Sequence, residues 1–238
     1  MAVEENGERG RTWAHSGHVK ETSGFFADRY YVPGDMNKPE IIAHRGRPRE
    51  FCVDHALAKA LRVFWEKGYE GTSLTDLTEA MAITRPSLYA AFGNKESLFR
   101  KTLDLYEREK LNYIGKALAE PTARGVAEAM LRGAVENVTS CDEPHGCLGV
   151  IASVACGEEA KSIRDAVQER SKRFHESIIE RFERAKAEGD LPPQIDVEGL
   201  TDLLRALLQG ISIQAGSGAT REELDRLVQT GLMMWPSA

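Results

Sequence analysis

The chain has 238 residues, of which 42% are hydrophobic and 29% are charged, a composition typical of a water-soluble protein with one large or two small domains. It contains no apolar run approaching the roughly 18 residues that a membrane span needs, and no apolar segment followed by a small-residue cleavage site. We therefore expect a cytoplasmic protein without a membrane partner.

Charge is unevenly distributed along the chain. The net charge of -6 at first argues against nucleic-acid binding. Residues 36–102, however, hold 11 basic and 8 acidic side chains, a net charge of +3, whereas residues 103–238 hold 16 basic and 23 acidic ones, a net of -7. The positive charge is thus concentrated in one segment, where a local basic face can bind phosphates.

Residues 1–35 show no helical or strand periodicity, and we predict that residues 1–46 form a flexible N-terminal extension and basic arm. Met36 begins a segment that resembles a natural start, so we hypothesise that translation begins there. The extension ends in a basic arm, residues 45–49, of the kind that can lie along a minor groove, and Arg47 is its candidate DNA contact.

From residue 51 onward the apolar spacing is helical, which predicts an all-α fold. The first helix should end at Gly68, in the usual C-terminal position of glycine. Thr72 and Ser73 offer N-cap hydroxyls for a second, short helix over 74–81, in which Leu74, Leu77 and Ala80 should be buried. Thr84 can cap a third short helix over 85–92, since Pro86 is tolerated in a first turn.

Two short helices joined by a tight turn and packed on a longer one predict a helix-turn-helix domain, whose third helix lies in the major groove. Leu88 and Phe92 should face inward. The outward side chains are small, polar or aromatic, as base recognition requires. Lys95 is placed to bind the phosphate backbone, and the N-terminus before the second helix is a natural phosphate site. The candidate DNA-binding residues are Arg47, Thr72, Ser73, Thr84, Arg85, Pro86, Ser87, Tyr89 and Lys95.

The rest of the chain is predicted to form a larger helical body. Its expected helices cover residues 95–119, 123–139, 147–156, 158–188, 196–215 and 220–234, with breaks at Pro192-Pro193 and Gly216–Gly218. Residues 147–156 are almost wholly apolar yet too short to span a membrane, so we expect them to be buried.

The motif Leu88-Tyr89, Phe92, Lys95-Glu96, Leu98-Phe99, preceded by a Gly-Tyr-Glu-Gly-Thr-Ser run from Gly68, resembles the TetR family of bacterial regulators. The resemblance covers about residues 47–105, and the Gly146-Cys147-Leu148-Gly149 junction adds to it more weakly. It implies a TetR-type DNA-binding domain over 47–105 and a ligand-binding and dimerisation domain over 106–238.

The resemblance also implies how such a protein works. A homodimer would form through helices 196–215 and 220–234 and would bind a palindromic, double-stranded operator. Its recognition helices would lie about one DNA turn, ~34–36 Å, apart. A small-molecule effector would then release the DNA, which makes a ligand-responsive repressor the expected function.

Two alternatives need to be weighed. Cys141, His145, Cys147 and Cys156 have residue types that bind zinc or sense oxidants, although Cys147 and Cys156 lie on an apolar helix where cysteine usually acts as a small hydrophobe. We therefore predict no metal site and no cofactor.

An α-helical enzyme or a helical scaffold is the other alternative, but the sequence holds no nucleophile elbow, phosphate-cradling glycine loop or zinc-protease motif.

Overall fold

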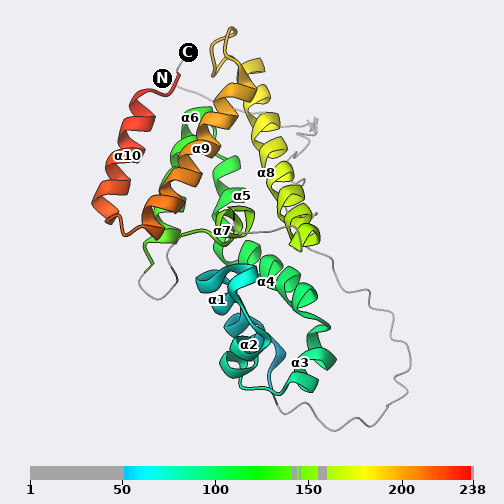
Figure 1. Cartoon of the computed structure of the whole chain (residues 1–238). Coiled ribbons are helices and arrows are strands. Elements are labelled where there is room, and N and C mark those ends of the chain that lie inside the picture. Colours follow the sequence, from blue (N-terminus) through cyan, green and yellow to red (C-terminus); the bar gives the residue numbers. More distant parts are fainter. Residues whose placement is uncertain (1–50, 141–143, 145, 155–159, 237–238) are drawn as a thin grey trace, which may run out of the picture. The chain divides into compact units, whose positions relative to one another are not determined.

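The computed structural model describes residues 51–140, 144, 146–154 and 160–236. The described segments contain ten helices and no strand, which confirms the all-α prediction (Figure 1). The helices are α1 Val53–Gly71, α2 Leu74–Met81, α3 Arg85–Phe92, α4 Lys95–Lys110, α5 Tyr113–Leu118, α6 Ala123–Val138, α7 Leu148–Val154, α8 Lys161–Ala187, α9 Val197–Gly216 and α10 Arg221–Met233. No helix in these segments has the length and apolarity needed to cross a membrane.

The predicted helix over 95–119 is wrong, because the chain breaks at Leu111 and Asn112 into α4 and α5. Tertiary packing accounts for the break. A Cβ on Gly133 of α6 would lie only 2.3 Å from the ring of Tyr113, so that ring rests directly on the α6 backbone. The first residue of α5 is thus packed against α6.

The other helices lie close to their predicted positions. The helix expected over 147–156 is observed as α7, with residues 155 and 156 outside the described segments, and the one expected over 158–188 is α8. The last two helices are confirmed as α9 and α10, shifted by about one residue.

A first hydrophobic core joins α1–α4 to α7 and to the beginning of α8. Phe64, Tyr69 and Phe99 form an aromatic cluster in it, with the Phe64 and Phe99 rings 5.0 Å apart and edge to face. Trp65 stacks edge to face on Tyr106 of α4 and donates a hydrogen bond of 3.1 Å from Nε1 to the Gly146 carbonyl. Trp65 therefore links α1 and α4 to the segment that leads into α7.

A second hydrophobic core lies between α5, α6, the C-terminal part of α8, α9 and α10. Leu204 is fully buried in it. Leu204 lies on a helix that the family resemblance assigns to a dimer interface, but its side chain packs inside the core of its own chain. The exposed large apolar residues of these helices are Leu203, Ile213 and Met233, together with Met234 just after α10.

Candidate nucleic-acid interface

Three capped helix starts shape the α1–α4 region. Ser73 and Asp76 form a full capping box at α2, with the Asp76 N–H donating to Ser73 Oγ at 3.0 Å and the Ser73 N–H donating to Asp76 Oδ2 at 2.8 Å. Thr84 caps α3 by accepting from the Ser87 N–H, and Asn94 caps α4 by accepting from the Ser97 N–H. The predicted caps at Ser73 and Thr84 are thus confirmed.

The tight turn between α2 and α3 depends on one residue with unusual backbone geometry. Ala82 has φ 54° and ψ 43°, the left-handed region. The Ala82 N–H donates to the Glu79 carbonyl and the Ile83 N–H to the Thr78 carbonyl, each at 3.1 Å. The short connection fixes the direction of α3 relative to α2.

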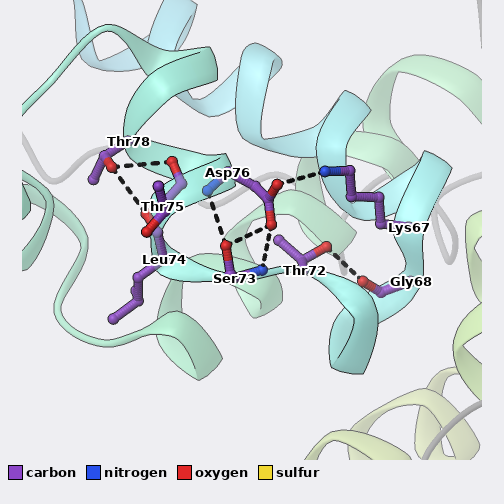
Figure 2. A network of polar contacts seen from close by, with 8 residues as sticks. All are labelled: Lys67, Gly68, Thr72, Ser73, Leu74, Thr75, Asp76 and Thr78. Atoms are coloured by element: carbon purple, nitrogen blue, oxygen red, sulfur yellow. Dashed lines mark hydrogen bonds and ion pairs between the residues drawn. The ribbon is translucent and has the colours of Figure 1, made fainter.

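Figure 2 shows the polar network at the start of α2. Lys67 of α1 donates to Asp76 Oδ1, while Asp76 Oδ2 accepts from the main chain and hydroxyl of Ser73. The hydrogen bond from Lys67, followed by those from Ser73, holds the pKa of Asp76 well below its usual range. Asp76 thus stays ionised and ties the start of α2 to α1.

Thr72 is placed differently from the other candidates. Its side chain is 1% exposed, and its hydroxyl donates to the Gly68 carbonyl at 2.6 Å. Gly68 has φ 69°, a conformation that breaks the helical geometry inside α1, at the place where the glycine was predicted to end a helix. The Thr72 hydroxyl therefore stabilises this kink, and the residue as a whole, main chain included, is closed to a phosphate.

The two faces of α3 differ as predicted. Leu88 and Phe92 are buried, whereas Arg85, Pro86 and Tyr89 are exposed. Among the described residues of α1–α4, Tyr89 is the only exposed large apolar side chain, and 49% of its surface is accessible. An exposed aromatic ring on a short helix, next to an arginine, is suited to contact DNA.

Hydrogen bonds position the side chains at the start of α3. Arg85 Nη2 donates to Thr75 Oγ1 of α2 at 3.0 Å. The hydroxyls of Thr84 and Ser87 lie 3.0 Å apart within hydrogen-bonding distance. These bonds restrict the rotamers of three candidate residues before any partner binds.

Lys95 opens α4, and its Nζ lies 4.5 Å from the centroid of the Tyr69 ring. Burial lowers the pKa of Lys95, while the charges of Glu70 and Asp76 act in the opposite direction. The ring restricts the position of the ammonium group, which stays partly exposed at the start of α4 and is therefore accessible to a phosphate.

The chain matches family models in both of its predicted domains. Residues 56–102 match the model described as bacterial regulatory proteins, tetR family, and residues 126–230 match the tetracyclin repressor-like C-terminal domain. A curated relative, the HTH-type transcriptional repressor ComR of Escherichia coli, is 37% identical over 194 residues, which cover 81% of this chain and 92% of ComR.

The chain belongs to the TetR family. It is therefore a helix-turn-helix regulator of transcription, as its sequence resemblance implied.

Solved TetR-family structures agree with this membership. A cysteine mutant of the regulator CifR, in complex with a 26-base-pair operator duplex, is 42% identical, with a TM-score of 0.76 over 80% of this chain and all of CifR. A TetR-family regulator from Rhodococcus is 40% identical over 77% of this chain and 98% of its own, with a TM-score of 0.55. A second curated relative, the repressor BdcR of Escherichia coli, is 27% identical and covers 75% of this chain and 86% of BdcR.

For this TetR-family chain, the structure brings eight of the nine candidate DNA-binding residues into one region, spanning the start of α2, the start and outward side of α3, and the start of α4. Arg47 and the basic arm lie outside the described residues. So do Cys141, His145 and Cys156, and the described residues contain no cluster able to hold a metal.

Sequence reasoning missed three residues that support the interface: Lys67, Tyr69 and Thr75. Lys67 and Tyr69 lie on either side of the kink at Gly68, and Thr75 lies ten positions before its partner Arg85. No local spacing rule links such partners, because the turn geometry brings them together. The one sequence signal for any of these three residues was Tyr69, an aromatic residue directly after the helix-breaking Gly68.

Proposed function

We propose that this TetR-family regulator is a cytoplasmic repressor that binds a palindromic operator as a homodimer and is released from it by a small-molecule effector. The observation that carries the proposal is the asymmetry of α3, which buries Leu88 and Phe92 and presents Arg85, Pro86 and Tyr89 outward. ComR and BdcR are named repressors, and CifR was solved with operator DNA, which supports the same role here.

The proposed DNA contacts fall into two groups. Arg85, Ser87 and Tyr89 would reach base edges or phosphates in the major groove, with Pro86 packing nearby. Ser73, Thr84 and Lys95 would bind phosphates around helix N-termini, where N–H groups and the helix dipole favour anions. Thr72 would support the start of α2 through its hydrogen bond to Gly68. Arg47 would lie along the neighbouring minor groove.

The proposed dimer interface lies on α9 and α10, which run side by side in Figure 1. Leu203 and Ile213 of α9 are 46% and 57% exposed, and Met233 at the end of α10 is 77% exposed. A shallow, mainly apolar groove between the two helices is lined by Leu207, Arg226, Leu227, Thr230, Gly231 and Met234. An exposed apolar surface of this kind is suited to a two-fold symmetric contact with a second copy.

We also propose that the two functions are divided between two domains that meet near residue 105. Residues 47–105 would read DNA and residues 106–238 would bind the effector and the second subunit. Effector binding can release DNA only if the effector has a higher affinity for the arrangement that does not fit the operator.

Selection of duplexes from a random-sequence library by the purified protein tests the proposal. We expect the enriched duplexes to contain an inverted repeat and to form, in a gel shift, a complex with two subunits per duplex. At moderate salt, an excess of unrelated DNA should not displace the protein from them. Enrichment of no common sequence, with equal binding to all duplexes, would contradict the proposed repressor function.

A further inference from the structure

Helix α8 belongs to both hydrophobic cores. Ile163 and Val167, near its beginning, are buried in the core that includes α1–α4, whereas Ile178 and Phe182, further along, are buried in the core of the body. Residues 168–177 of this continuous helix therefore connect the two cores.

Arg170 lies in this connecting stretch and binds two carboxylates of α4. Its Nη1 donates to Glu107 Oε2 at 2.7 Å, and its Nη2 donates to Asp104 Oδ1 at 2.5 Å. The side chains of Arg170 and Glu107 are each only 20% exposed. Asp104 is 62% exposed, so the bond to Glu107 is the one that salt screens less than a surface pair, whereas the bond to Asp104 adds direction to the guanidinium.

A second bond between the same helices lies closer to the DNA-binding region. Arg100 Nη2 of α4 donates to the Ser162 carbonyl at the start of α8 at 2.8 Å, and its guanidinium also pairs with Glu96. Arg173 of α8, by comparison, pairs with Glu169 one turn away on the same helix, and His175 of α8 lies 3.3 Å from Asp202 of α9.

The position of α4 in turn controls α3. Only Gly93 and Asn94 separate the two helices, and Leu98 and Phe99 of α4 are fully buried in the core that holds Leu88 and Phe92 of α3. A tilt of α4 would therefore carry α3 with it, because a close-packed core transmits displacement instead of absorbing it.

We propose that Arg170 is a positioning residue that fixes α4 against α8 and thereby sets the spacing between the two recognition helices of the dimer. The inference rests on the proposed function, since spacing matters only to a dimer that reads two half-sites. Asp104 and Glu107 are its partners in this role. The ion-pair cluster makes the protein selective for operators with one half-site separation.

The test compares Arg170→Met with Arg173→Met, a matched control that removes an arginine of the same helix whose ion pair is with Glu169 of α8 itself. Each full-length variant is titrated with the inverted-repeat duplex selected by the wild type and with versions carrying one or two extra base pairs between the half-sites. Sedimentation and thermal unfolding confirm that each variant is a folded dimer. Arg170→Lys, which keeps the charge and loses the bridging geometry, serves if Arg170→Met does not fold.

We expect Arg170→Met to weaken binding to the selected duplex by roughly three- to tenfold and to reduce the discrimination against respaced duplexes by a similar factor. Glu107→Gln should reduce the discrimination against respaced duplexes less than Arg170→Met does. The variant that carries both substitutions should lose less discrimination than the sum of the two single losses. Discrimination equal to that of Arg173→Met would overturn the role of Arg170, as would an additive double variant. If the wild type selects no duplex at all, the proposed function fails instead.

Discussion

Arg85 of α3 and Thr75 of α2 are joined by a hydrogen bond of 3.0 Å from the guanidinium Nη2 to the hydroxyl Oγ1. The bond uses one of the five N–H donors of the guanidinium, and both side chains are exposed. Thr75 thus holds Arg85 near the first turn of α3 before DNA binds, which lowers the entropy that the arginine loses on binding.

Arg85→Ala is expected to weaken binding to the selected operator by ~1–3 kcal/mol if the guanidinium reads a base, measured by fluorescence anisotropy. Thr75→Val removes only the partner hydroxyl and should cost less. The matched control is Arg132→Ala, an exposed arginine of α6 paired with Glu128. Equal affinities of the Arg85 and Arg132 variants would remove Arg85 from the interface.

Tyr89 permits a test that separates its ring from its hydroxyl. Tyr89→Phe should lose about 1 kcal/mol of operator affinity if the hydroxyl donates to a phosphate, whereas Tyr89→Ala should lose more because ring contacts disappear as well. Gel-shift titration of both variants measures the difference. Full affinity in Tyr89→Ala would show that the exposed side of α3 does not touch DNA.

Lys95→Met is expected to weaken binding to all duplexes about equally and to lower the slope of log affinity against log salt by about 1, because one phosphate contact is lost. Tyr69→Leu, which removes the ring under the ammonium group, should lower affinity less and leave the slope unchanged. A salt slope in Lys95→Met equal to that of the wild type would show that this lysine does not neutralise a phosphate.

Asp76 makes the stability of the protein depend on pH. Its hydrogen bonds with Lys67 and Ser73 lower its pKa in the folded state, so its contribution is fully present above the ordinary aspartate pKa of about 3.9 and is lost as the pH falls from there through the lowered value. Urea unfolding should therefore show a larger difference between the wild type and Asp76→Asn at pH 6 than at pH 3. Asp165→Asn, on exposed α8 surface, is the control, and a pH-independent difference for Asp76→Asn would contradict the assignment.

Ile213→Glu is expected to yield monomers that no longer bind the palindromic operator, since it buries a charge in the proposed interface of α9 and α10. Sedimentation velocity measures the change. Ala119→Glu, at an exposed position between α5 and α6, should remain dimeric. A stable dimer of Ile213→Glu would place the interface elsewhere.

Local sequence patterns were sufficient to predict most helices and the recognition face, because caps, glycine and proline act within a few residues. Ser73 and Thr84 have their predicted capping roles, whereas Gly68 kinks α1 where it was predicted to end it, and α1 continues to Gly71. The buried set of α2 was partly wrong: Ala80 is exposed, and the inward positions are Leu77 and Met81, four residues apart.

The features that sequence reasoning missed depend on contacts distant along the chain. The break before Tyr113 follows from its packing on Gly133, with no glycine or proline at the break itself. The family resemblance assigns the helix of Leu204 to an interface, but only the packing of α9 against α6 and α8 shows that this side chain belongs to the core of its own chain. Likewise, Arg170 has the appearance of an ordinary charge on an amphipathic helix until α4 is placed beside it.

The central claim, that the exposed side of α3 lies in the major groove, is tested most directly by placing a photo-crosslinking amino acid at position 89 and irradiating the operator complex. We predict crosslinks to bases of two half-sites with centres about 10 base pairs apart, and none from the same probe at exposed position 66 of α1. Crosslinking from position 66 and none from position 89 would contradict the account.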